Sequence, residues 1–118
     1  MPQITLEYAA NLGNSVPFQA LAAELHPMLV RVAGAALPAC KSRAYRADDY
    51  YMADGGAQHA FVHLRIGLMP GRSPEALAEV NRQAMALLQK HIPAPAGLAV
   101  QYSVEIVDIR RETYLRAP

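Results

Sequence analysis

The sequence predicts a two-layer α/β (α+β) domain, in which two helices cover one face of a four-stranded mixed sheet. Three observations support this fold. Four segments alternate apolar and polar residues with the period of a strand, and two longer segments repeat apolar residues with the period of a helix. Their order along the chain is β-α-β-β-α-β, with two β-α-β halves of about equal length and no obvious sequence repeat. Both helices should therefore pack their apolar sides on the same face of the sheet.

The first strand is expected at residues 1–8, where Ile4, Leu6 and Tyr8 alternate with polar residues. Pro2 follows the initiator directly. If Met1 is removed, Pro2 becomes a secondary amine at the start of an ordered strand, where partial burial would lower its pKa toward neutrality. Such a group suits general base catalysis. The alternative is that proline is merely common after an initiator and has no chemical role here.

The first helix is expected between Ser15 and Gly34. Ser15 is a candidate N-cap, and Pro17 lies in the first turn, where its missing N–H is harmless. Pro27 should kink the helix because its ring clashes with the carbonyl four residues back, and Gly34 should end it. The apolar residues that recur at helical spacing are Phe18, Leu21, Ala22, Leu25, Met28, Leu29 and Val32.

The second and third strands are expected at residues 38–47 and 57–68. The loop between them contains the Asp54-Gly55 step, a good turn signal. We therefore expect the two strands to pair as a hairpin.

The second helix has a strong start, with Ser73 as N-cap, Pro74 at the first position and Glu75 near the positive end of the helix dipole. The last strand, residues 98–107, shows the cleanest alternation of the chain. Residues 108–118 form a C-terminal tail that is expected to be solvated or to dock. The arginines of this tail are Arg110, Arg111 and Arg116.

The composition limits the class of protein. A chain of 118 residues, about half of them apolar, fits a single domain, residues 1–118, with one core. A net charge of +1 and the absence of a basic run give no case for nucleic acid as a partner. No apolar stretch is long enough to span a membrane, and the start lacks a signal peptide pattern. With Cys40 as the only cysteine, we expect a cytoplasmic protein without disulfides.

Three cationic residues are candidates for binding a substrate. Arg72 lies at the start of the second helix, where free N–H groups favour anions, and it could bind a carboxylate or stabilise a developing enolate. Lys41 and Arg43 share one face of the second strand and are candidates for lining the same pocket. The alternatives are a solvated loop arginine and ordinary surface charge.

Two histidines, His59 and His63, would share one face of the third strand. They lack a third partner, so we expect no metal site. His63 is expected to be a packed or hydrogen-bonded residue.

Several short blocks occur in order along the chain and carry a resemblance to a known family. Together with Pro2 and Glu7, they resemble the 5-carboxymethyl-2-hydroxymuconate isomerase family of the tautomerase superfamily. The resemblance covers residues 2 to about 92 and is weaker beyond. The blocks are Lys41-Ser42-Arg43, Met52-Ala53-Asp54-Gly55, Ala60-Phe61-Val62-His63 and Gly71-Arg72-Ser73.

This resemblance implies a cofactor-independent isomerase that forms a homotrimer, with active sites near the subunit boundaries and no metal. The substrate would be a small di- or tricarboxylate, an unsaturated 2-hydroxy acid whose dienol becomes an enone as the N-terminal proline, Pro2, moves a proton. Arginines would hold its carboxylates, one of them at the position of Arg72. The family usually has another arginine where this chain has Lys41. A lysine keeps the charge but loses the planar two-point grip on a carboxylate.

Two other functions remain open from the sequence. One is a small ligand-binding or regulatory module with a ferredoxin-like sheet, which would not need a free N-terminus. The other is a structural trimer of tautomerase type whose activity has decayed or is promiscuous.

Overall fold

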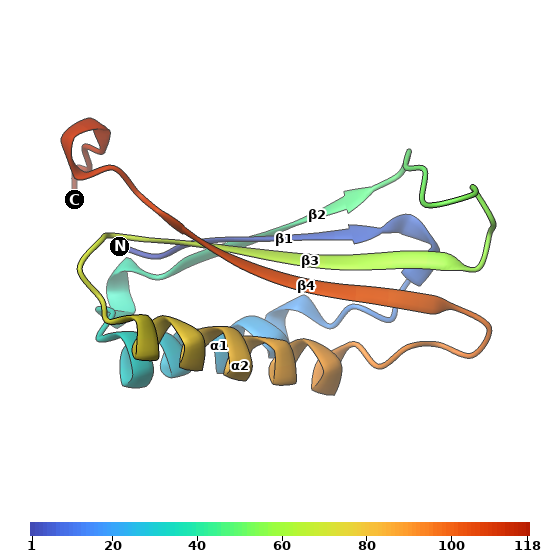
Figure 1. Ribbon diagram of the computed structural model, residues 1–118, viewed down its shortest axis with the longest axis horizontal. Coiled ribbons are helices and arrows are strands. Elements are labelled where there is room, and N and C mark those ends of the chain that lie inside the picture. Colours follow the sequence, from blue (N-terminus) through green and yellow to red (C-terminus); the bar gives the residue numbers. More distant parts are fainter.

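Both helices lie on one side of the four-stranded sheet in the computed structural model, which describes residues 1–118 (Figure 1). This confirms the predicted two-layer architecture and the β-α-β-β-α-β order. Neither helix is long and apolar enough to cross a lipid bilayer. The strands are β1 (Gln3–Ala9), β2 (Lys41–Ala47), β3 (His59–Leu68) and β4 (Ala99–Asp108), and the helices are α1 (Phe18–Ala33) and α2 (Pro74–His91). Short 3-10 helices cover Ala10–Leu12, Leu37–Ala39 and Arg111–Thr113.

The sheet has the strand order β2-β1-β3-β4, so the predicted hairpin between the second and third strands is wrong. β1 lies between them, parallel to β2 and antiparallel to β3, while β3 and β4 are parallel. The physical reason is that a helix connects the two strands of each parallel pair, α1 between β1 and β2 and α2 between β3 and β4. The two halves therefore join through β1 and β3. The loop of residues 48–58 is long enough to cross β1, a distance of about 10 Å for two strand spacings.

The helix starts differ in how well the sequence predicts them. α2 begins as expected, since the Oγ of Ser73 accepts a hydrogen bond from the N–H of Ala76 at 3.1 Å. α1 begins at Phe18, later than the cap predicted at Ser15, and has no side-chain cap. The N–H of Ser15 instead donates to the carbonyl of Leu12 at 3.0 Å, so this serine belongs to the turn before the helix.

α1 ends where the sequence predicts. Gly34 has a φ of +68°, a left-handed conformation that favours glycine, and its N–H donates to the carbonyl of Val30. Pro27 lies inside α1, which continues through it from Phe18 to Ala33. The kink expected at Pro27 stays a prediction.

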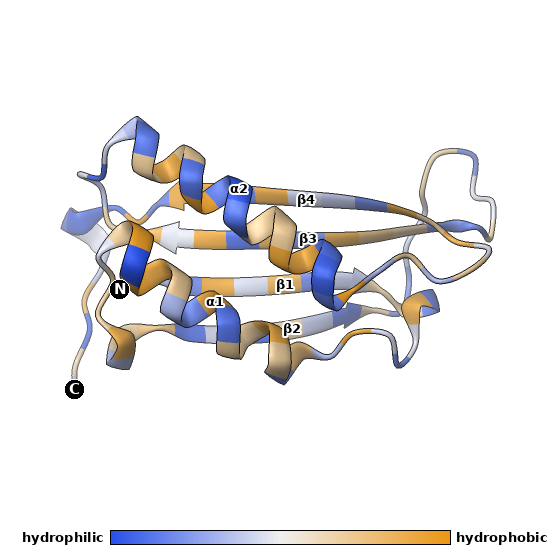
Figure 2. Cartoon of the chain, turned by 90° about the horizontal axis from the view of Figure 1, so that it is seen from below, coloured by the Kyte–Doolittle hydropathy of each residue, from blue (hydrophilic) through white to orange (hydrophobic).

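The core lies between the helices and the sheet and contains no buried polar side chain. Figure 2 looks onto this helix layer and shows the two helices lying over the strands. Successive residues of a strand point to opposite faces, and the helix-side residues of β1 and β3 are buried, except for the partly buried Tyr8. The largest of these buried residues are Ile4, Leu6, Val62, Leu64, Ile66 and Leu68.

The other side of the sheet carries mostly polar residues and has no helix over it; we call it the open face (Figure 1). Phe61 and His63 lie on it, because their neighbours in β3 are buried on the helix side. By strand register and alternation, the open face includes Gln3, Thr5, Glu7, Lys41, Arg43, Tyr45, His59, Phe61, His63, Arg65, Gly67, Gln101, Ser103, Glu105 and Val107.

Candidate active site

Pro2 is buried at the beginning of β1, one of the two central strands. Its carbonyl accepts a hydrogen bond from the N–H of Lys41 at 3.2 Å, which starts the parallel pairing of β1 with β2. On its other side, β1 pairs with the last residues of β3, from which the chain turns toward Arg72. The start of the chain is therefore fixed in the sheet, although chain termini usually fray.

The α-amine of Met1, next to Pro2, lies in surroundings that disfavour its charged form. Burial lowers the pKa of this amine below its ordinary value of 8.0, and the positive charge of Arg72 lowers the pKa further. Lys41 and Arg116 act in the same direction, while Cys40 acts against them. These four side chains therefore gather around the start of the chain.

Arg72 is half-buried and is held by two backbone carbonyls. Its Nε donates to the carbonyl of Ala33 at 2.7 Å, and its Nη1 donates to the carbonyl of Met69 at 2.8 Å. Ala33 is the last residue of α1, where carbonyls lack helical partners. Because a guanidinium has five N–H donors, the remaining ones are free for a carboxylate.

The turn before Arg72 depends on glycine. Gly71 has a φ of +114°, which L residues rarely adopt, and a Cβ added there would meet no atom within 4 Å. Glycine is therefore needed here for its backbone conformation and not for lack of space. This turn directs Arg72 back toward the end of α1 while the chain enters α2 at Ser73.

Lys41 and Arg43 lie on β2 at the same end of the sheet. The Nζ of Lys41 donates to the carbonyl of Ala39 at 3.0 Å, and its side chain is exposed. Arg43 donates to the Oε1 of Gln3 at 2.7 Å. The structure thus places all four residues that the sequence singles out, Pro2 included, around the start of β1 and β2.

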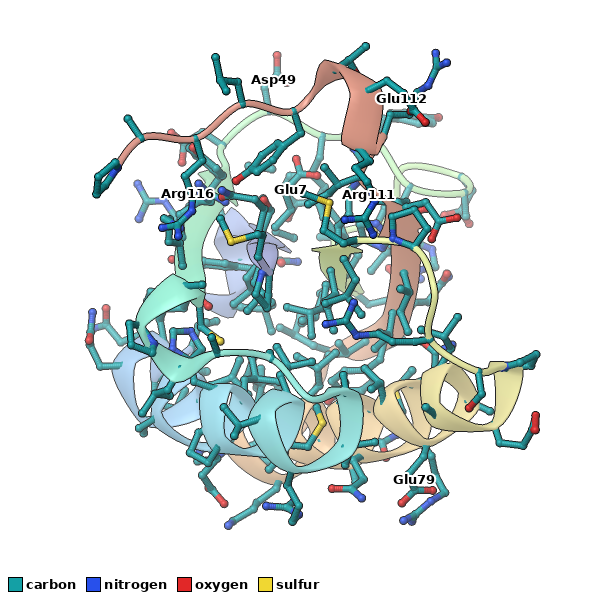
Figure 3. The ribbon with its side chains drawn as sticks, turned by 90° about the vertical axis from the view of Figure 1, so that its left-hand side faces the viewer. Glu7, Asp49, Glu79, Arg111, Glu112 and Arg116 are labelled. Atoms are coloured by element: carbon teal, nitrogen blue, oxygen red, sulfur yellow. The ribbon has the colours of Figure 1, made fainter.

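The C-terminal tail supplies residues to this end of the sheet that the sequence did not assign to the site. Figure 3 looks onto this end and shows the tail crossing above the sheet on the side opposite the helices, with Arg116 extending from it toward the strands. Tyr114 accepts a hydrogen bond through its hydroxyl from the Nε2 of Gln3 at 3.1 Å. The only signal in the sequence was the presence of arginines in the tail.

None of the four cations at this end of the sheet forms an ion pair with an acidic side chain. Elsewhere in the chain most cations do, including Arg46 with Asp48 at 2.9 Å and Lys90 with Glu24 at 2.9 Å. We call the unpaired group the cationic cluster. It consists of Lys41, Arg43, Arg72 and Arg116.

The two histidines of β3 are engaged separately on the open face. The Nε2 of His59 lies 2.9 Å from the Oδ1 of Asp54. The Nδ1 of His63 lies 2.6 Å from the Oγ of Ser103, and its Nε2 lies 3.2 Å from Glu105. This confirms His63 as a hydrogen-bonded residue. No group of three or more histidine, cysteine, aspartate or glutamate side chains is placed to hold a metal ion.

The single chain does not form a closed pocket around Pro2. Four cavities lie on its surface, and neither Pro2 nor Arg72 lines any of them. One of them, of about 300 Å³, lies on the open face beneath the tail and is lined in part by Gln3, Arg65 and Tyr114. The cationic cluster is thus assembled in one chain, whereas a substrate pocket is not.

Comparison with known proteins places these features in one family. The family model described as 5-carboxymethyl-2-hydroxymuconate isomerase matches residues 2–117, so the match extends well past residue 92, where the resemblance from sequence alone weakens. The chain is 28% identical over 108 residues to a 5-carboxymethyl-2-hydroxymuconate Delta-isomerase from Escherichia coli. That alignment covers 89% of this chain and 86% of the relative.

Solved structures give the same result. The crystal structure of a 5-carboxymethyl-2-hydroxymuconate isomerase from Deinococcus radiodurans R1 is 30% identical to this chain, with a TM-score of 0.89, covering 98% of this chain and 88% of that one. A fused 4-OT described as a wild-type symmetric trimer is 17% identical, with a TM-score of 0.74, covering 95% of this chain and 91% of that one. At that identity the likeness concerns the fold alone.

Proposed function

Since the chain belongs to the 5-carboxymethyl-2-hydroxymuconate isomerase family, we propose that it moves a proton within an unsaturated 2-hydroxy acid of that type, with Pro2 as base and acid. The observation that carries the proposal is the burial of Pro2 within the cationic cluster. The same surroundings lower the pKa of the neighbouring α-amine. Removal of Met1 would put a secondary amine at this position.

The proposed reaction requires only a base that becomes an acid. Unprotonated Pro2 takes the proton of the 2-hydroxyl group, and the electron pair of that O–H bond forms the carbonyl. The two conjugated C=C bonds are replaced by one C=C bond between their former positions. The electron pair released at the far carbon of the diene then takes the proton from Pro2. Negative charge develops on oxygen during this shift, and Arg72, whose charge acts on the neighbouring α-amine, would stabilise it. Lys41 and Arg43 would hold carboxylates of the substrate.

We also propose that the enzyme is a homotrimer acting in the cytoplasm. Both edge strands, β2 and β4, have an unpaired side in the single chain, which proteins usually cover. Large apolar side chains are exposed at Tyr45 (58%), Tyr51 (79%) and Leu115 (97%). A neighbouring subunit could cover these and close a pocket over Pro2. Sedimentation that shows a monomer at micromolar concentration would contradict this assembly.

The test compares two preparations whose N-termini are first established by mass spectrometry. One begins at Pro2, and the other retains one residue before it, so that the Pro2 nitrogen is an amide and cannot act as a base. With 2-hydroxymuconate-type dienols, we expect the first to be active and the second to lose at least about 100-fold in kcat/KM, the range of general base catalysis. Equal activity of the two preparations would exclude proline catalysis.

The pH dependence provides a second measurement on the same protein. The amine acts as a base only when unprotonated, so kcat/KM should fall as the pH drops through its pKa and reach a plateau above it. Because burial and neighbouring cations lower the pKa of the amine at this end, we expect the single apparent pKa to lie below that of a prolyl amine in an unfolded peptide. An apparent pKa equal to or above that of the unfolded peptide would contradict a desolvated amine beside Arg72.

A further inference from the structure

The C-terminal tail is attached to the sheet rather than free. The N–H of Ile109 donates to the carbonyl of Leu68 at 2.8 Å, which continues the pairing of β3 with β4 by one residue. The side chain of Ile109 packs on Gly67, because a Cβ added to Gly67 would lie 3.3 Å from it. Further along, Arg111 donates to the carbonyl of Pro70 at 3.4 Å.

A second attachment lies closer to Pro2. The amide of Gln3 uses both of its ends: the Nε2 donates to the hydroxyl of Tyr114 in the tail at 3.1 Å, and the Oε1 accepts from Arg43 in β2 at 2.7 Å. Gln3 is the residue that follows Pro2. The tail is therefore held at both ends of its short 3-10 helix, and its position over the start of β1 is defined.

Arg116 follows this second attachment by two residues. Its side chain extends from the tail toward the sheet (Figure 3), it is exposed, and it forms no hydrogen bond or ion pair within the chain. Its charge acts on the amine at the start of the chain together with those of Arg72 and Lys41. A free guanidinium near a base, with no acid beside it, is available for an anionic ligand.

We propose that Arg116 binds a carboxylate of the substrate, and that the tail thereby selects compounds with three carboxylates over compounds with two. This inference rests on the proposed function, because it deepens the description of the same site. Three cations, Arg72, Lys41 and Arg116, surround the start of the chain without an acidic partner. In the proposed function Arg72 stabilises the charge that develops on oxygen, and Lys41 and Arg43 hold two carboxylates. Arg116 is therefore the cation left for a third carboxylate, because each carboxylate needs its own partner when it leaves water.

The test measures kcat/KM for two dienols, 5-carboxymethyl-2-hydroxymuconate with three carboxylates and 2-hydroxymuconate with two. Arg116→Gln should lower kcat/KM about tenfold for the first, mainly by raising KM, and less than about twofold for the second. A remote carboxylate is bound equally in the ground state and the transition state, so kcat should change little. Arg116→Lys should restore most of the loss.

The matched control is Arg110→Gln, which removes the same charge from the same tail. Arg110 is exposed and its side chain has no partner, so the selectivity of this variant should equal that of the parent. Equal losses of Arg116→Gln on both dienols, or a loss in Arg110→Gln as large as that in Arg116→Gln, would overturn the proposal.

A binding measurement separates this inference from the proposed function. By calorimetry at low ionic strength, the parent protein beginning at Pro2 should bind propane-1,2,3-tricarboxylate more tightly than glutarate, and Arg116→Gln should remove the difference. If that selectivity is found without turnover, isomerisation fails and the role of Arg116 stands. If turnover is found and Arg116→Gln changes neither the ratio of kcat/KM for the two dienols nor the preference in binding, the role of Arg116 fails and isomerisation stands. A parent protein that discriminates in neither assay overturns the role of Arg116 as well.

Discussion

The two faces of the sheet are built from the same strands and differ in almost every other respect. In β3, Val62, Leu64 and Ile66 are fully buried against the helices, whereas the residues between them, such as His63 and Arg65, lie on the open face with part of their surface in water. The helix side contributes burial of apolar surface, the main favourable term in folding. The open face contributes charge and hydrogen bonds. Apolar burial and polar contacts are thus separated by alternation along a single strand.

The largest contrast should appear when adjacent residues of β3 are truncated. Leu64→Ala removes a fully buried side chain and should lower the free energy of unfolding by about 2–5 kcal/mol. Arg65→Ala, on the other face, should change it by less than about 0.5 kcal/mol, since its contact with Glu105 at 3.8 Å is exposed. Urea unfolding at one fixed protein concentration measures both. Similar losses would mean that the open face is as important for stability as the core.

Arg72 should not follow this separation, since it binds the end of α1 and also has a role in the proposed reaction. Arg72→Ala should lower kcat/KM by about 100-fold or more, if it stabilises the developing charge. It should also lower the free energy of unfolding by about 1–2 kcal/mol, because the carbonyls of Ala33 and Met69 lose their donor. Steady-state kinetics and urea unfolding test the two effects separately. A variant with full activity and lowered stability would make Arg72 a structural residue only.

A smaller effect is expected in the turn that leads from the sheet to the helix layer. Gly71→Ala should lower the free energy of unfolding by about 1 kcal/mol, through backbone strain at a φ of +114° rather than through a clash. Thermal unfolding followed by circular dichroism measures the change. The control is Ala57→Gly, in the loop at the opposite end of β3, which should have little effect. An unchanged midpoint in Gly71→Ala would show that the turn can relax.

The smallest effect should come from the outer surface of the helix layer. The Arg82 guanidinium, followed by the amide of Gln83, lowers the pKa of Glu79 to about 2 from its ordinary value of 4.5. The stabilisation is therefore fully present above pH 4.5 and is lost as the pH falls toward 2. Glu79→Gln should flatten the change of melting temperature over that interval only. Because the pair is exposed, the difference at pH 7 should be slight, and a large one would contradict this account.

The sequence predicts those features of the fold that depend on residues close together along the chain, and it does not predict those that depend on distant residues. Alternation in β3 separates the set that contains Val62 and Leu64 from the set that contains Phe61 and His63, and the structure buries the first set against the helices. Alternation does not identify the neighbouring strand, and for that reason the hairpin was predicted where β1 now lies. Ser73 was recognised as a cap because its partner is three residues away, whereas Ser15 bonds backward into a turn.

The site shows the same limit. Pro2 was singled out by its position after the initiator, Arg72 by its position at the start of a helix and Lys41 by its strand face, and the structure brings them to one end of the sheet. Arg116 and Tyr114 could not be placed in the same way. Their positions depend on contacts with residues far along the chain, such as the bond between Tyr114 and Gln3. No periodic pattern in the tail encodes such a contact.

The central position of β1 has a consequence for the timing of protein synthesis. Pro2 is buried, and its carbonyl is paired with the N–H of Lys41. The other neighbour of β1 is β3, which is translated later still. While the first forty or so residues leave the ribosome, these partners do not yet exist, and the N-terminus is a solvated end that a processing aminopeptidase can reach. If the protein is processed to begin at Pro2, as proposed above, removal of Met1 is therefore easiest on the nascent chain, before the sheet closes.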